Sequence, residues 1–155
     1  MEFEDFRLRI EASTETSYLA LATTADGEEA SCQFTLPFGA SDLENLVLRI
    51  GRPRQTRRAR AASEVKRVES FGDALFTSVF QGDVKDILRK ARARADADGR
   101  GVRIVLSLSH APTLLDLPWE FLYDRRSSSA CSGALRSSGT SSSRTVASLF
   151  RSTAA

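Results

Sequence analysis

Residues Leu117 to Asp124 read Leu-Pro-Trp-Glu-Phe-Leu-Tyr-Asp, the densest local signal in the sequence. Pro118 suits the first turn of a helix, because its missing N–H has no intrahelical partner there. Trp119 and Leu122 then share one face of that helix, and Glu120 lies where the helix dipole favours negative charge. The stretch predicts a short helix that is held in place by a buried tryptophan.

The residues that precede this stretch alternate as a strand does. Val102, Ile104, Leu106 and Leu108 occur at every second position and share one face. Val105 lies on the other face and predicts burial on both sides of the strand. Residues 101–124 are therefore expected to form a strand followed by the short helix.

Helical spacing dominates residues 41–98. Three helices are expected: a short one that begins at Ser41, a longer one that begins at Ser63, and a third that Asp83 caps. Between the first two, the segment from Arg52 to Ala62 has no periodicity and carries five arginines. An exposed loop is expected there.

The first part of the chain, residues 3–36, contains three strand-like runs. Phe6 to Ile10 and Ala30 to Leu36 alternate apolar and polar side chains, and Tyr18 to Thr23 is more uniformly apolar. Asp26-Gly27 separates the second run from the third, and Asp-Gly between alternating runs is typical of a hairpin turn. The pattern predicts a three-stranded antiparallel meander.

The order of these elements sets the fold class and the domains. Three strands, three helices and a further strand predict an α+β to α/β fold, with an N-terminal antiparallel β-meander and helices that cover a sheet. Residues 1–124 form the expected folded region. Residues 125–155 hold eleven serines, five arginines and no acidic residue, so a disordered Ser/Arg-rich tail is expected there.

Charge and composition argue against several classes of protein. The net charge of +2 includes the five tail arginines, so residues 1–124 carry a net charge of −3 and present no broad basic surface. No apolar run approaches the ~18 residues that cross a bilayer, and the acidic start of the chain does not resemble a secretory signal. Cys32 and Cys131 lie in different contexts, so neither a disulfide nor a metal site is expected, and the cytoplasm is the expected compartment.

The stretch from Leu117 to Asp124 resembles the opening motif of CHAT domains, caspase-like modules of the cysteine-peptidase class found in bacterial proteins. Upstream blocks resemble the family in the same order: Phe34-Thr35-Leu36-Pro37-Phe38 before Leu43-Glu44-Asn45-Leu46, then Phe71-Gly72-Asp73-Ala74-Leu75-Phe76. The resemblance covers residues 3 to 124. It implies the first part of a caspase-like sheet, with Leu117 to Asp124 as a structural motif.

In that family, the catalytic His and Cys come much later in the chain, at the ends of sheet strands. Nothing after Asp124 matches the His or Cys motif, so no catalytic, cofactor or metal residue is carried over and the chain is expected not to be an enzyme. The change of composition at Arg125 suggests a protein truncated at the edge of the catalytic fold, through a frameshift in a GC-rich gene. A genuine linker tail is the alternative explanation of these residues. Without the next strand, residues 102–108 are expected to be an unprotected edge of a marginally stable, aggregation-prone protein.

Three other groups of residues have a functional and a plainer interpretation. His110 with Cys32 suggests a cysteine–histidine dyad, but a cysteine in a core strand is usually inert packing. Glu120 and Asp124 suggest paired carboxylates, but a dipole-favoured Glu and a helix-end Asp are the stronger interpretation. The arginines from Arg52 to Arg60 suggest nucleic-acid binding, but no aromatic residues interleave to stack bases.

These observations leave one expected function and two alternatives. The expected function is that of a non-catalytic fragment of a CHAT-domain protein, with no cofactor and with a protein, or the remainder of the domain, as its partner. The first alternative is an interaction module that offers a separate caspase-like partner an exposed sheet edge after Tyr123. The second is a weak polyanion binder that uses the Arg-rich segments.

Overall fold

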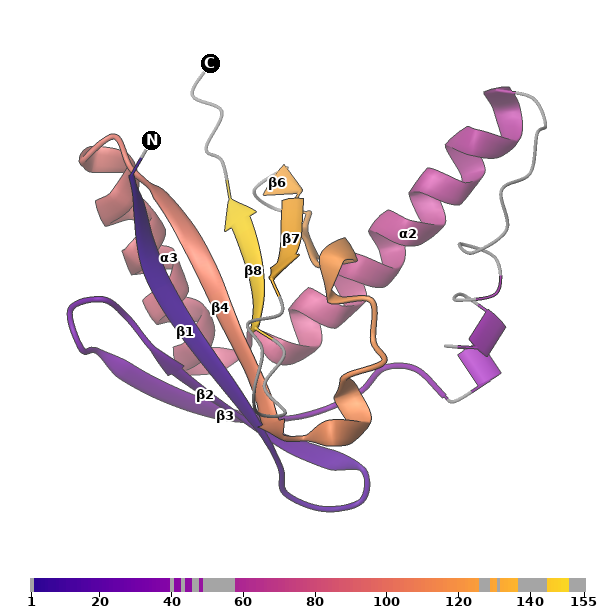
Figure 1. Ribbon diagram of the computed structural model, residues 1–155, viewed down its shortest axis with the longest axis horizontal. Coiled ribbons are helices and arrows are strands. Elements are labelled where there is room, and N and C mark those ends of the chain that lie inside the picture. The colour runs from indigo at the N-terminus through magenta and orange to yellow at the C-terminus, as the bar shows by residue number, and fades with distance from the viewer. Residues whose placement is uncertain are drawn as a thin grey trace.

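Strand β1 (Phe3–Ala12) is flanked by a strand on either side (Figure 1). The computed structural model describes residues 2–39, 41–42, 44–45, 48, 58–125, 129–130, 132–136 and 145–150. β1 pairs antiparallel with β2 (Ser17–Thr23) and parallel with β4 (Gly101–His110). The sheet is therefore mixed, in agreement with an α+β fold.

The predicted β-meander is confirmed. β1, β2 and β3 (Glu29–Thr35) follow one another as antiparallel neighbours. In the turn between β2 and β3, Gly27 has a φ of 86°, a left-handed conformation that glycine adopts without steric cost. The backbone N–H of Thr24 donates to the carbonyl of Glu28 over 2.9 Å and closes this turn.

Two helices, α2 (Arg58–Val79) and α3 (Gly82–Ala97), pack on one face of the sheet. The even-numbered residues of β1 and β4 face them and are buried, among them Phe6, Leu8, Ile104 and Leu106. α3 contributes five buried residues to the same core, namely Val84, Ile87, Leu88, Ala91 and Ala95. Figure 1 shows that the C-terminal half of α2 lies close to the sheet, whereas its N-terminal half runs away from it.

The helix starts differ from the prediction in two places. α2 begins at Arg58 instead of Ser63, because the intervening residues are arginines and alanines, which are strong helix formers. The predicted loop is therefore wrong over residues 58–62, while residues 52–57 lie outside the described part of the chain. α3 has Gln81 at its N-cap position without a side-chain cap, and Asp83 lies in the first turn.

The short helix expected at Ser41 is described only in part. Ser41, Asp42, Glu44, Asn45 and Leu48 are helical. The side-chain amide of Asn45 donates to the carbonyl of Ser41 over 2.8 Å, a contact between neighbouring turns of a helix. The apolar residues predicted to form its buried face (Leu43, Leu46, Val47 and Ile50) lie outside the described residues.

Segments that the composition predicts to be disordered form strands at 129–130, 132–136 and 145–150. β8 (Thr145–Phe150) pairs antiparallel with β4, and β7 (Ser132–Arg136) pairs with β8. The sheet order is β3-β2-β1-β4-β8-β7, so β4 is not an unprotected edge. Both expectations are wrong here, because a composition averaged over the tail hides the apolar and β-branched run Thr-Val-Ala-Ser-Leu-Phe.

No helix of the described residues covers the second face of β1 and β4. Arg7 and Arg9 are exposed on this face, and Val105 is half-buried beside them. The prediction that β4 is buried on both faces is therefore wrong. We call this surface, formed by the odd-numbered residues of β1–β4, the open face.

Candidate functional site

The motif Leu117 to Asp124 packs through its tryptophan. Trp119 begins the single 3₁₀ turn η2 (Trp119–Phe121) and is 3% exposed. Its indole Nε1–H donates to the carbonyl of Leu114, in the preceding turn η1 (Pro112–Leu114), over 2.8 Å. The expected short helix is therefore one 3₁₀ turn, and Pro118 lies just before it, at the N-cap. The buried Trp119 side chain satisfies its polar atom within the same loop, as buried tryptophans require.

Gly72 of α2 permits the motif to approach the helix backbone. A Cβ at this position would lie 1.8 Å from the carbonyl oxygen of Phe121 and 2.9 Å from the Cβ of Tyr123. Only glycine, which has no side chain, leaves room for this contact. Next to it, Phe71 stacks on Phe38 with ring centroids 4.5 Å apart.

The last residue of the motif joins it to α3 as well. The Asp124 carboxylate accepts a hydrogen bond from Arg92 Nη1 over 2.5 Å, and the two side chains are only 11% and 17% exposed. The Arg92 guanidinium lies 5.7 Å from the ring centroid of Phe76 in α2. The Asp124 carboxylate therefore has an arginine of α3 as its ion-pair partner. No local sequence signal predicts a contact between residues 92 and 124.

Cys32 and His110 do not meet. Cys32 lies on β3, where its Sγ donates to the carbonyl of Val79 over 3.3 Å and burial raises the pKa of the thiol. His110 is exposed at the end of β4, and strands β2 and β1 lie between β3 and β4. Three strand spacings amount to about 14 Å, far beyond hydrogen-bond reach. The arrangement does not form a cysteine–histidine dyad.

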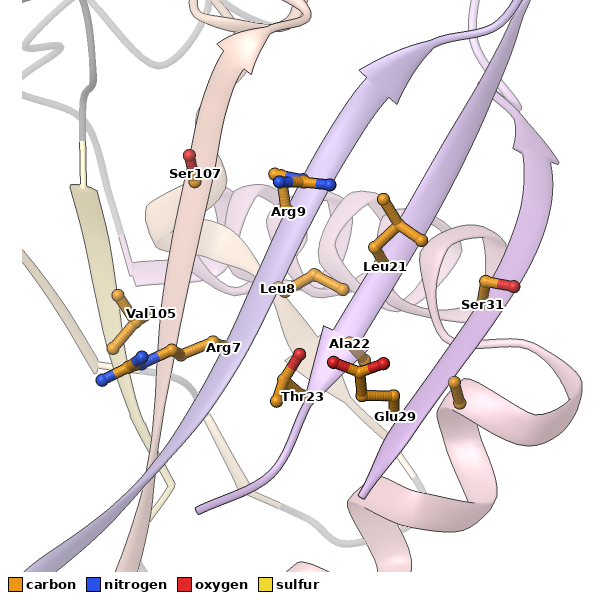
Figure 2. A pocket seen from close by; sticks show the side chains of 11 residues that line it. Arg7, Leu8, Arg9, Leu21, Ala22, Thr23, Glu29, Ser31, Val105 and Ser107 are labelled. Atoms are coloured by element: carbon orange, nitrogen blue, oxygen red, sulfur yellow. The ribbon is translucent and has the colours of Figure 1, made fainter. Parts of the chain in front are cut away.

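The open face carries a shallow hollow of about 560 Å³ (Figure 2). Figure 2 shows side chains of β1, β2, β3 and β4 around it, with Arg7 and Arg9 of β1 among the charged ones. Arg9 Nε lies 3.0 Å from Glu11 Oε1 on the same strand. The hollow brings together arginines, hydroxyl groups and aliphatic side chains, a surface suited to contact with another molecule more than to acid–base chemistry.

A second charged cluster ties the meander to α3. Arg94 Nη2 lies 2.6 Å from Oε1 of Glu4, whose side chain is buried, and Arg94 also pairs with Asp26 in the β2–β3 turn. The carboxylate of Glu4 raises the pKa of Arg94 through a hydrogen bond. This cluster is structural, since each charge has an opposite partner.

The described residues hold no group of three or more His, Cys, Asp or Glu side chains placed to bind a metal ion. Within the same part of the chain, no helix has the length and apolar character needed to cross a membrane. Of the Arg-rich segment, residues 52–57 lie outside the described part, and so do the side chains of Arg58 and Arg60.

Comparison of the chain with protein-family models, with curated proteins and with solved structures found no match. The resemblance to CHAT domains therefore rests on the residues of the sequence, and we treat it below as a proposal.

Proposed function

We propose that this chain is a non-catalytic fragment of a CHAT-domain protein of the caspase-like cysteine-peptidase family. One observation supports the proposal most. The block Phe71 to Phe76 and the motif Leu117 to Asp124, which resemble the family separately, form one packing unit around Gly72 and the Phe121 carbonyl. Two blocks of a family's pattern that depend on each other in space are expected to occur together, because a change in either disturbs the contact.

The non-catalytic part of the proposal rests on the positions of Cys32 and His110. Cys32 and His110 lie too far apart to interact, and burial raises the pKa of the Cys32 thiol, whereas a nucleophilic cysteine needs a lowered pKa. The role that remains is to contact and support other protein segments. The proposed family's catalytic His and Cys have no counterpart among the residues that the structure brings together.

Sequencing of the gene through codon 124 and several hundred bases beyond tests the family assignment. A reading frame that continues with an apolar strand and later His and Cys segments supports the proposal. A sequence without such a frame, in any of the three, counts against it. In parallel, the purified chain is expected to leave peptide substrates of caspase-like enzymes intact; hydrolysis that disappears in Cys32→Ser contradicts the non-catalytic role.

A protein–protein interaction module that acts with a separate caspase-like partner is the second candidate, and the open face of the sheet favours it. After Tyr123, β5 (Tyr123–Asp124) pairs with β6 (Ser129–Ala130) along one of its two edges. The open face also presents the half-buried Val105 beside Arg7 and the half-buried Leu21 beside Arg9. Co-purification with the catalytic half of a CHAT-domain protein, lost on Arg7→Glu and kept on Glu15→Lys, tests this candidate.

A further inference from the structure

Strand β3 ends the sheet on one side and has a partner on only one of its edges. Within the described residues it pairs with β2 through seven consecutive positions, and no strand follows it in the sheet order. In a terminal strand, every second residue points its N–H and C=O outward. Natural edge strands are usually protected by proline, lysine or a bulge. β3 reads Glu-Ala-Ser-Cys-Gln-Phe-Thr, with an unbroken register, and has none of these.

A hollow of about 920 Å³ lies between the start of β3 and α3. Its lining joins residues 28–30 to the outward side of α3 from Asp83 to Asp96. Those helical positions span about 20 Å along the axis, close to the roughly 24 Å length of a seven-residue strand. A strand that pairs with the outer edge of β3 would therefore lie alongside α3, and the side chains on its helix-facing side would enter this hollow.

The hollow is acidic once its ion pairs are taken into account. Lys90 Nζ lies 2.7 Å from Glu28 Oε1, and Arg89 lies 3.9 Å from Asp86. Arg92 is engaged by Asp124. On the α3 side of the hollow, the carboxylates that take part in no ion pair of the described residues are those of Asp83 and Asp96. Glu29 also borders the hollow, but its side chain lies on the open face.

We propose that the β3 edge binds an extended peptide segment of a partner protein, which adds to the sheet as a strand and directs lysine or arginine side chains into this hollow. Main-chain hydrogen bonds to β3 supply the pairing, and the carboxylates of Asp83 and Asp96 select basic side chains. A second copy of this chain fits less well, because its β3 brings no basic residue and one further carboxylate, that of Glu29. The inference does not depend on the CHAT assignment.

Binding of three short peptides to the full chain tests this inference. The first alternates lysine with valine, the second replaces every lysine by glutamate, and the third keeps the lysines but carries prolines that remove main-chain donors. The lysine peptide is expected to bind at least about tenfold tighter than the glutamate peptide, because its contacts with the Asp83 and Asp96 carboxylates become repulsive when glutamate replaces lysine. Hydrogen exchange should then slow at alternate amides of β3.

Charge reversal locates the site. The double variant Asp83→Lys, Asp96→Lys is expected to weaken binding of the lysine peptide about tenfold, while Glu15→Lys, an exposed residue in the β1–β2 turn, leaves it unchanged. A thermal transition like that of the native chain shows that each variant folds. Equal binding of the lysine and glutamate peptides, undiminished binding of the proline peptide, equal loss in both variants, or no binding of the lysine peptide overturns the proposal.

Discussion

The two faces of the sheet are built from the same strands and differ in almost every physical property. On the covered face, even-numbered residues of β1 and β4 pack against α2 and α3 with almost no exposure, as Phe6 and Ile104 do. On the open face, the residues between them are mostly charged or hydroxyl-bearing, as Asp5, Arg7 and Ser107 are, and Val105 is a half-buried aliphatic among them. A period of two along a strand assigns each residue to one face. The packing that stabilises the fold is therefore concentrated on the covered face, whereas the open face is available for contact with another molecule.

The motif extends the covered face beyond the strands. Trp119, Gly72 and Asp124 join the loop after β4 to both helices through a buried ring, a close backbone contact and a buried ion pair. Nothing comparable attaches to the open face in the part of the chain that is described. The residues of the family-like motif are therefore also residues that hold the loop after β4 against the two helices.

Trp119→Ala is expected to have the largest effect. Removal of a buried tryptophan costs about 3–5 kcal/mol of unfolding free energy, and the carbonyl of Leu114 loses its indole donor. Chemical denaturation measures the loss. Trp119→Phe is the matched control: it keeps most of the ring and should lose less. If the unfolding free energy of Trp119→Ala lies within about 1 kcal/mol of the native value, which is the error of the method, the packing role of the motif is contradicted.

A pair of neighbours on β1 tests the contrast between faces directly. Leu8 is 1% exposed on the covered face, and Leu8→Ala is expected to lower the unfolding free energy by about 2–5 kcal/mol. Arg7 is exposed on the open face, and Arg7→Ala should change it by no more than about 0.5 kcal/mol. Similar losses in the two variants, measured by denaturant titration, remove the distinction between the faces.

Gly72→Ala is expected to cause the next largest loss of unfolding free energy. The added methyl group meets the Phe121 carbonyl, a backbone atom that does not rotate away, so the motif must shift from α2. Overpacking of this kind costs about 1–3 kcal/mol, although alanine favours a helix more than glycine by about 1 kcal/mol. Thr77→Ala, exposed in the same helix, gives the effect of composition alone. Stabilisation by Gly72→Ala, seen as a higher midpoint of thermal unfolding, shows that the close contact is not needed.

Local patterns predicted the strands well and the contacts of the motif poorly. Alternation placed β1, β2, β3 and β4, because a period of two needs no knowledge of distant residues. The single-residue roles of Gly72 and Arg92 depend on partners about fifty and thirty residues away, so no local pattern reveals them. The open face was missed for a related reason: an apolar Val105 between apolar neighbours does not tell which face a helix will cover.

The smallest expected effect concerns Cys32, on the helix side of the edge strand β3. Burial raises the pKa of its thiol above the ordinary value of 9.0, so the folded state binds the proton more tightly than the unfolded chain does. The resulting stabilisation is complete below pH 9 and is lost as the pH rises through the folded pKa. Denaturant titrations at neutral and strongly alkaline pH should thus show a steeper loss of stability in the native chain than in Cys32→Ala. The difference is expected to be small, because the thiol is only half-buried. If stability falls equally with pH in the native chain and in Cys32→Ala, the raised pKa of the Cys32 thiol is contradicted and the thiol is exposed to solvent.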